Sequence, residues 1–249
     1  MISPKPSPYA EPRLFCFPYA GGSASVYGKW PGLASRRMHV RGVELPGRGV
    51  RLGEEPFVSL PPLIRCLADQ LEPLLDRPFA FFGHSMGGLV AFELARTLRE
   101  RGCPSPRHLF ISAAAAPGTP QSRRSLHDSS DEEVLEELRD LGGTPQELLD
   151  DKELMAMAVP TLRADYSVLG NYEYRESAPL DVPITVFGGR SDEIAPPADL
   201  RGWQSHTDAG YRIKLFPGDH FFLHSAAVEI LKTVADAVCP GPGDSVSAA

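Results

Sequence analysis

The stretch from Phe79 to Gly88, F-A-F-F-G-H-S-M-G-G, constrains the fold of this chain more than any other. An apolar run leads into a serine between two glycines, and an apolar helical pattern then continues to the breakers Gly102 and Pro104. A strand, a sharp turn and a helix in this order are typical of a G-x-S-x-G nucleophile elbow, whereas the five letters alone would indicate an ordinary tight turn. We therefore expect Ser85 to project from the carboxyl edge of a parallel sheet.

The rest of the chain alternates between strand patterns and helix patterns. Besides the run before Ser85, strands are predicted at residues 14–18, 38–45, 108–114, 184–189 and 211–216. Helical spacing of apolar residues predicts helices over residues 60–75, 89–98, about 197–206 and 223–238. So regular an alternation predicts the α/β class, with a mostly parallel, doubly wound sheet.

The alternation stops between about residues 121 and 174, where we expect a helical lid insertion. Ser130 with Glu133 and Thr144 with Glu147 have the spacing of capping boxes, which predicts helices near 131–141 and 145–150. A longer helix, kinked at Pro160, is expected from residue 151 to about residue 172. Its apolar residues are expected to line an apolar chamber at the active edge of the sheet as well as to pack, although packing alone is the commoner reason for such a stripe: Leu154, Met155, Met157, Leu162, Tyr166 and Leu169.

Length and composition favour one domain, which we place at residues 13–238. The chain has 249 residues, 42% of them hydrophobic, which is enough to fill one core. Residues 1–12 contain four prolines and are expected to form an extended lead-in, and residues 239–249 are expected to be a disordered tail.

Charge and the remaining composition exclude several classes of protein. The net charge of -7 argues against a nucleic-acid binder, which would carry a basic stripe. No apolar run approaches the roughly 18 residues of a membrane span, and the N-terminus lacks the apolar core of a signal peptide, so we expect a cytoplasmic protein. Four scattered cysteines without a C-x-x-C pair indicate neither a disulfide framework nor a zinc site.

A serine nucleophile needs an imidazole base, and the imidazole needs a carboxylate that fixes its tautomer. Ser85, Asp192 and His220 each follow the carboxyl end of a predicted strand, in the order Ser, Asp, His that α/β-hydrolases use. We therefore predict these three as a catalytic triad. His84, inside the elbow, is expected to point away from the site.

Alternatives to two members of this triad stay open. His224 lies one helical turn after His220 and is the main rival for the base, and the two histidines also form an H-x-x-x-H pair of metal-binding type. We expect no metal, because no third ligand is evident in the sequence. Glu193 and Asp199 are rivals to Asp192, but only Asp192 closes the turn directly after the glycine pair.

The first predicted strand runs into the glycine loop Tyr19-Ala20-Gly21-Gly22-Ser23. We expect the backbone N–H groups of Ala20 and Met86 to form an oxyanion hole at the carboxyl edge of the sheet. A plain strand-to-helix turn is the alternative for this loop. A phosphate loop is disfavoured because the G-K-[ST] that would complete it is missing.

Taken together, these motifs resemble the type II thioesterases, the stand-alone editing enzymes of polyketide synthases and nonribosomal peptide synthetases. The resemblance covers roughly residues 13–238 and is carried by F-P-Y-A-G-G-S, V-E-L-P-G-R-G, G-H-S-M-G-G-L-V-A-F-E-L-A-R, L-G-G-T-P-Q-E, L-R-A-D-Y, F-G-G-R-S-D and P-G-D-H-F-F-L. It implies an α/β-hydrolase fold and hydrolysis of acyl groups from the phosphopantetheine arm of carrier proteins. It also implies no cofactor beyond the phosphopantetheine of the substrate, and we expect a monomer. The alternatives are a carboxylesterase or acyltransferase with the same triad, and a non-catalytic acyl-binding protein.

Carrier proteins of this kind are acidic, so their docking on an acidic enzyme requires a local basic patch. The candidates are two pairs, one after the second predicted strand and one at the start of the lid: Arg48 and Arg51, and Arg123 and Arg124. Solvated surface charge is the alternative for each of them.

Overall fold

The structure is a computed structural model that describes residues 11–34, 36–119, 129–143 and 146–239. The expected disordered tail beyond residue 239 and most of the expected lead-in lie outside these ranges. So do the first residues of the expected lid, among them Arg123 and Arg124.

Six strands form one sheet in the order β2-β1-β3-β4-β5-β6, and every neighbouring pair is parallel. Their bounds are Arg13–Phe17 for β1, His39–Gly42 for β2, Phe79–His84 for β3, Leu109–Ser112 for β4, Ile184–Gly189 for β5 and Tyr211–Phe216 for β6. The parallel α/β sheet that the sequence predicts is therefore confirmed. Because all strands run the same way, every loop that follows a strand emerges at one edge of the sheet.

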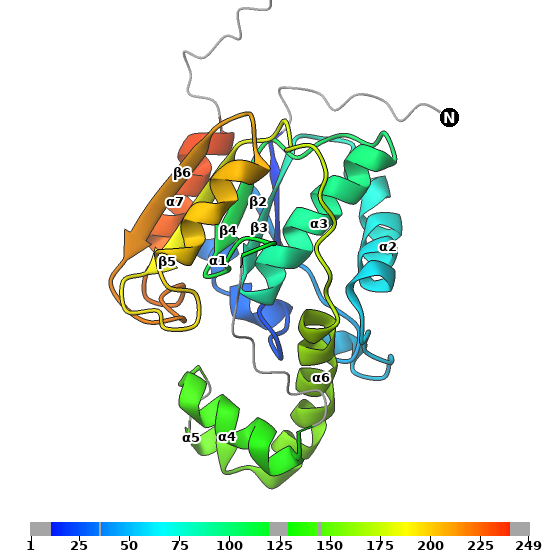
Figure 1. Cartoon of the computed structure of the whole chain (residues 1–249), viewed down its shortest axis with the longest axis vertical. Helices are drawn as coiled ribbons and strands as arrows, with labels where there is room; N and C mark the ends of the chain where they lie inside the picture. The colour runs from blue at the N-terminus through cyan, green and yellow to red at the C-terminus, as the bar shows by residue number, and fades with distance from the viewer. Residues whose placement is uncertain (1–10, 35, 120–128, 144–145, 240–249) are drawn as a thin grey trace, which may run out of the picture.

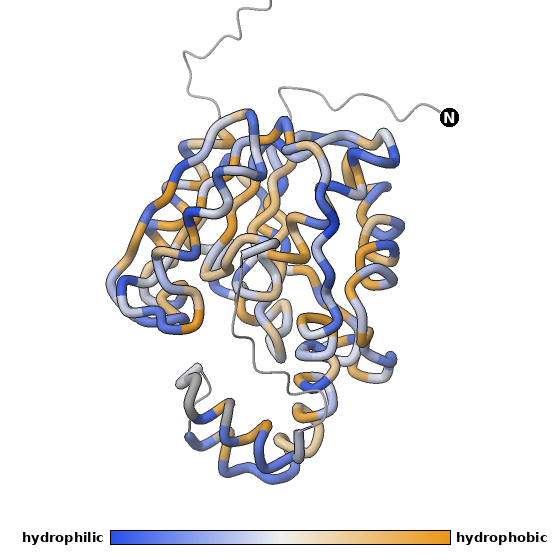
Figure 2. Tube along the Cα trace, in the orientation of Figure 1, coloured by the Kyte–Doolittle hydropathy of each residue, from blue (hydrophilic) through white to orange (hydrophobic). Residues whose placement is uncertain are grey.

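Helices cover both faces of the sheet (Figure 1). One face is covered by α1 (Trp30–Leu33) and α7 (Ala227–Val238), and the other by α2 (Leu60–Leu71) and α3 (Met86–Glu100). Two apolar cores follow from this layering, because successive side chains of a strand point to opposite faces. Phe81 packs in the core below α2 and α3, whereas Phe82 packs in the core below α7. In Figure 2 hydrophobic residues correspondingly gather along the central strands between these helices.

The lid consists of α4 (Asp131–Leu141), α5 (Gln146–Leu149) and α6 (Lys152–Gly170), which lie beyond the carboxyl ends of the strands (Figure 1). The predicted capping box at the start of α4 is confirmed, since the Ser130 hydroxyl accepts from Glu133 N–H and the Glu133 carboxylate accepts from Ser130 N–H. Gly142, with φ 67, ends α4 in the left-handed conformation. The second predicted capping box rests on Thr144, which lies outside the described residues.

Short 3-10 helices complete the fold: η1 (Ala24–Tyr27), η2 (Gly49–Arg51), η3 (Glu72–Leu74) and η4 (Asp199–His206). The helix expected near residues 197–206 is a 3-10 helix that begins at Asp199, shortly after two consecutive prolines. The edge strand β2 is shorter than expected, because the chain turns away toward Pro46 after Val43 donates its N–H to Cys16. None of the helices in the described part of the chain combines the length and the apolar character of a membrane span.

Candidate active site

Ser85 lies at the turn between β3 and α3, with φ 52 and ψ -117. A positive φ is strained for a residue with a Cβ, and strain of this kind is typical of functional turns. The turn is held from both sides. Ser85 N–H donates to the carbonyl of Ser112 at 2.8 Å, and the Ser85 carbonyl accepts from Gly88 N–H at 2.9 Å. The serine is half-buried, at the sheet edge where the strands end.

The two glycines of the elbow are required by close backbone approach. A Cβ on Gly83 would lie 1.9 Å from the carbonyl oxygen of Gly87. A Cβ on Gly87 would lie 2.1 Å from the carbonyl oxygen of Phe17, the last residue of β1. Either Cβ would collide with backbone atoms, so both positions require glycine. Because neither glycine has a side chain, the start of α3 can pack directly against the end of β1.

Asp192 and His220 are joined by a hydrogen bond between Asp192 Oδ2 and His220 Nδ1 at 2.9 Å. Both side chains are buried. The other carboxylate oxygen, Oδ1, accepts from the backbone N–H groups of Ile194 and Ala195, each at 2.9 Å. A carboxylate accepts hydrogen bonds, so His220 carries its proton on Nδ1 and leaves Nε2 as a proton acceptor.

A glycine also allows the loops that carry these two residues to meet. A Cβ on Gly189, the last residue of β5, would lie 2.3 Å from the carbonyl oxygen of Asp219. Next to it, Ser191 N–H donates to the carbonyl of Gly218 at 3.0 Å. The loops after β5 and β6 are thereby held side by side, and the acid meets the imidazole.

The three predicted triad residues thus all lie at the same edge of the sheet, on loops after β3, β5 and β6. A hydrogen bond links Asp192 to His220, whereas within the described part of the chain none links Ser85 to His220. Hydrogen bonds of a catalytic site are often long without substrate and shorten when it binds. The catalytic roles of Ser85, Asp192 and His220 stay predictions that this arrangement supports.

The rivals of these residues are placed differently. The His224 side chain is exposed, and its ring stacks on the Phe221 ring, with 6.4 Å between the ring centroids. Glu193 is exposed and Asp199 begins η4, while the carboxylate that binds His220 is that of Asp192. The geometry therefore favours His220 and Asp192 over their rivals.

The expectation that His84 points away from the site is wrong. Its ring meets the ring of His220 edge-on, with 5.3 Å between the centroids, and its Nδ1 lies 2.9 Å from the Ser112 hydroxyl. Burial, helped by the neighbouring imidazole of His220, holds the pKa of His84 well below its usual value, so the ring is neutral. The sequence held the signal. His84 lies two residues after Phe82 in the same strand and so faces the same side of the sheet.

The two predicted oxyanion donors lie on segments that touch. Met86 is the first residue of α3, and the first N–H groups of a helix have no acceptor within it. Ala20 follows the end of β1, which the start of α3 contacts through Gly87. The segment that leads to Ala20 thus lies against the start of α3, the helix that directly follows Ser85. The role of the two N–H groups as an oxyanion hole stays a prediction.

The predicted chamber residues of the lid fall into two groups. Leu162 and Tyr166 pack with Val134 and Val159 in a small cluster that also touches Ala20. Met155 is buried as well, and Gly143 at the end of α4 lies against the ring of Phe221, the neighbour of His220. Leu169 packs instead against the core below α2 and α3, and Leu154 is 39% exposed. The lid therefore meets the catalytic edge through α4 and the middle of α6.

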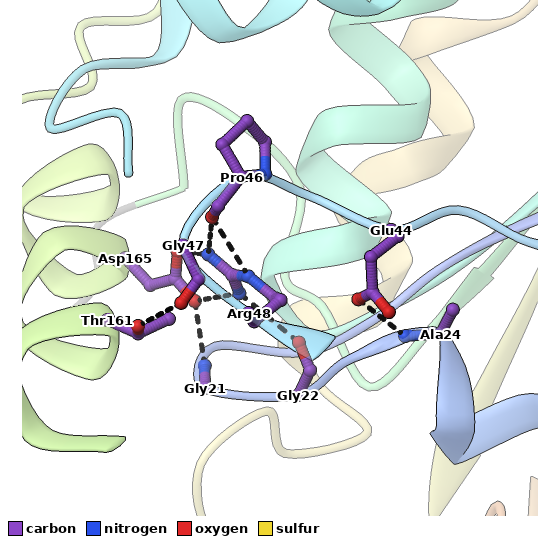
Figure 3. Close-up of polar contacts among 9 residues, drawn as sticks. All are labelled: Gly21, Gly22, Ala24, Glu44, Pro46, Gly47, Arg48, Thr161 and Asp165. Carbon is purple, nitrogen blue, oxygen red and sulfur yellow. Dashed lines mark hydrogen bonds and ion pairs between the residues drawn. The ribbon is translucent and has the colours of Figure 1, made fainter. Parts of the chain in front are cut away.

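Of the predicted docking arginines, Arg48 is placed wrongly by the sequence reasoning. It is only 6% exposed, and its guanidinium forms two hydrogen bonds with the Asp165 carboxylate (Figure 3). An arginine that is buried and paired cannot present its charge to a carrier protein. Arg51 lies nearer the surface, where two hydrogen bonds to the exposed Glu54 raise its pKa. Its docking role stays a prediction.

Comparisons with known proteins agree with this geometry. The family model described as "Thioesterase domain" matches residues 12–238. The gramicidin S biosynthesis protein GrsT of Aneurinibacillus migulanus is 42% identical over 223 residues, covering 90% of this chain and 87% of that protein.

Solved structures of similar proteins superpose over most of the chain. RedJ, a thioesterase from the prodiginine biosynthetic pathway of Streptomyces coelicolor, is 38% identical with a TM-score of 0.86, covering 93% of this chain and 88% of that one. The type II thioesterase BorB, from the borrelidin biosynthetic cluster, is also 38% identical, with a TM-score of 0.81 and 94% and 95% of the two chains covered.

Proposed function

The chain belongs to the thioesterase family and is a thioester hydrolase, and from this premise we propose that it removes acyl groups from the phosphopantetheine arm of carrier proteins. The proteins it resembles are named for the biosynthesis of gramicidin S, prodiginine and borrelidin. The proposed role is accordingly editing, in which stalled or aberrant chains are cleared from a polyketide or peptide synthase. The proposed setting is the cytoplasm, and the proposed partners are acyl or peptidyl carrier proteins.

The observation that carries the proposal is the hydrogen bond between Asp192 and His220 at the sheet edge that also bears Ser85. With its Nδ1 proton directed at the carboxylate, His220 has Nε2 free to take the Ser85 proton. The Ser85 oxygen then attacks the thioester carbonyl carbon, and the carbonyl electrons move to its oxygen. The backbone N–H groups of Ala20 and Met86 stabilise that oxyanion.

Collapse of this intermediate breaks the carbon–sulfur bond, and the departing thiol takes the proton from His220. A thiol is more acidic than an amine, so its departure demands less of the general acid than peptide cleavage does. The acyl group is then an ester on Ser85. Water attacks the ester carbonyl carbon while His220 takes a proton from the water. His220 then gives this proton to the Ser85 oxygen, and the free acid leaves.

The test compares acyl-pantetheine thioesters with oxygen esters of the same acyl group, using the wild-type chain and Ser85→Ala. We expect the thioester to be turned over faster, and Ser85→Ala to lower kcat on the order of a millionfold without loss of fold. A second comparison offers the same acyl group on an acidic carrier protein. Retained activity in folded Ser85→Ala would overturn the assigned nucleophile, and faster turnover of oxygen esters would favour an esterase.

A further inference from the structure

The glycine loop after β1 is a β-turn whose centre is the peptide between Ala20 and Gly21. The Tyr19 carbonyl accepts from Gly22 N–H at 2.9 Å, and Gly21 has φ 75, whereas Ala20 has no positive φ. This is the pattern of a type II turn, in which the third residue takes a positive φ. Type I and type II turns differ chiefly in the direction of the central peptide. An acceptor for Gly21 N–H therefore fixes the orientation of the peptide that follows Ala20 and holds the turn in its type II form.

The acceptor for Gly21 N–H comes from the lid. Asp165 Oδ2 lies 2.7 Å from the Gly21 nitrogen, although the two residues are 144 positions apart in the chain (Figure 3). One helical turn earlier in α6, Leu162 presses on the same glycine, since a Cβ on Gly21 would lie 2.9 Å from Leu162 Cδ1. One face of the lid helix α6 thus contacts, through a hydrogen bond and through packing, the loop that carries a proposed oxyanion donor.

Arg48 holds the Asp165 carboxylate in place. Its Nη1 lies 2.6 Å from Oδ2 and its Nη2 lies 2.7 Å from Oδ1, a two-point pairing that fixes the plane of the carboxylate. Arg48 Nη1 also donates to the carbonyl of Gly22 at 3.2 Å, so the turn is held at two adjacent residues. Beside the pair, Thr161 donates its hydroxyl to the Gly47 carbonyl at 2.6 Å (Figure 3).

Stability alone does not account for this arrangement. The Asp165 residue is 2% exposed and Arg48 6%, and a buried ion pair is commonly no more stabilising than apolar side chains of similar volume. What an apolar pair could not supply is an acceptor for the backbone N–H of Gly21. We therefore attribute the buried carboxylate to its hydrogen bond with the Gly21 N–H of the loop, and the buried arginine to the need to compensate the charge of that carboxylate.

We propose that Asp165 is a positioning residue for the oxyanion hole, acting through the Gly21 N–H and held by Arg48. The carboxylate anchors the turn at Gly21, so the segment that carries the Ala20 N–H is held in place beside the start of α3. The lid helix α6 thereby takes part in catalysis without touching the substrate at this point. The inference rests on the proposed function, because it concerns the same oxyanion hole.

The decisive comparison uses two double variants that differ only in the acceptor. Both replace the arginine by methionine. Arg48→Met with Asp165→Asn keeps an uncharged oxygen that can accept from Gly21 N–H, whereas Arg48→Met with Asp165→Leu has a side chain of similar size without one. We expect the asparagine variant to keep kcat within about threefold of wild type and the leucine variant to lose about 10- to 100-fold, with KM little changed.

Two further readouts report on the oxyanion hole itself. Inhibition by an acyl trifluoromethyl ketone, which mimics the tetrahedral intermediate, should weaken in the leucine variant by the same factor as kcat/KM falls. Reaction of Ser85 with a fluorophosphonate should slow in parallel and needs no thioester. The matched control is Asp131→Asn, which removes an exposed ion pair between α4 and Arg163 of α6 and should leave all rates unchanged.

Equal kcat values in the two double variants would overturn the inference. If both values lay below that of the wild type, the loss would reflect only the removed ion pair. A wild type that hydrolyses no acyl-pantetheine thioester would refute the proposed function instead, while the fluorophosphonate rates would still test the inference. If the leucine variant does not fold, amide exchange in the wild type decides. Gly21 N–H should exchange slowly, and exchange as fast as that of a solvent-exposed amide would overturn the proposal.

Discussion

Replacing Gly87 by alanine tests whether the contact between α3 and β1 positions the donors of the proposed oxyanion hole. The added Cβ would lie 2.1 Å from the carbonyl oxygen of Phe17 and 2.7 Å from that of Pro18. Cβ atoms do not approach other heavy atoms within 3.0 Å, and both neighbours are backbone atoms that no side-chain rotation can remove. The start of α3 must therefore move away from β1 by about 0.9 Å or more.

A shift of this size separates the two segments that carry Ala20 and Met86. Misplacement of a catalytic group by about 1 Å costs on the order of a hundredfold in rate, and loss of one oxyanion donor costs about 100- to 1,000-fold. We expect Gly87→Ala to lower kcat for an acyl-pantetheine thioester by about 100-fold or more. Overpacking of the core should also reduce the free energy of unfolding by about 1–3 kcal/mol.

The matched control is Gly88→Ala, one residue further along the same helix. Its Cβ would meet the side chains of Ala114 and Ile111 at 3.0 and 3.1 Å, which needs a shift of only a few tenths of an ångström and leaves the gap to β1 alone. We expect kcat within about threefold of wild type, measured with the melting temperature of each variant. Folded Gly87→Ala with wild-type kcat would refute the argument, because the contact would then not position the donors.

Four further predictions follow from the site and its surroundings. His220→Ala should lower kcat as far as loss of the nucleophile does, whereas His224→Ala should cost less than about tenfold, and the opposite ranking would move the base to His224. Met155→Asp should slow turnover of long acyl thioesters more than of acetyl, because an unpaired carboxylate beside hydrocarbon is costly, and equal losses would remove Met155 from the chamber. Arg51→Glu should raise KM for an acyl-carrier protein but not for acyl-pantetheine, and an unchanged KM for both would exclude its docking role. Burial lowers the pKa of His108 from 6.5 to about 4, so the unfolded chain binds the extra proton as pH falls. In urea titrations the wild type should therefore lose up to about 3 kcal/mol more than His108→Gln between pH 6.5 and pH 4, and parallel pH profiles would contradict this.

The sequence predicts local features of this protein well, because each depends on a few neighbouring residues. The elbow around Ser85 needs only a strand, two glycines and a helix in succession, and the capping box at Ser130 needs only a spacing of three. The meeting of Asp192 with His220 is also predictable, since parallel strands bring the loops that follow them to one edge. The length of β2 is not, because an edge strand ends where its neighbour and the covering loop allow.

Contacts between distant segments are what sequence reasoning misses, and Arg48 is the clearest case. In the chain it stands between two glycines in a polar loop, a context in which an arginine is normally solvated. Its partner Asp165 is 117 residues away on a lid helix whose placement no periodicity reveals. The spacing of its apolar residues predicts the buried stripe of that helix, but Asp165 lies among the same buried positions and is not apolar.

The paired burial of Arg48 and Asp165 changes where the proposed carrier-protein partner can bind. Each charge is neutralised by the other inside the protein, so neither adds to the field outside it, and the net charge of -7 stays on the surface. Attraction of an acidic partner must then come from exposed cations close to the mouth of the predicted substrate chamber. Arg51 shares its charge with Glu54 and offers only part of such a patch. The two arginines of the loop after β2 therefore have different roles. Arg48 holds the turn at Gly21 and Gly22 from inside the protein, and of the two only Arg51 can face a partner.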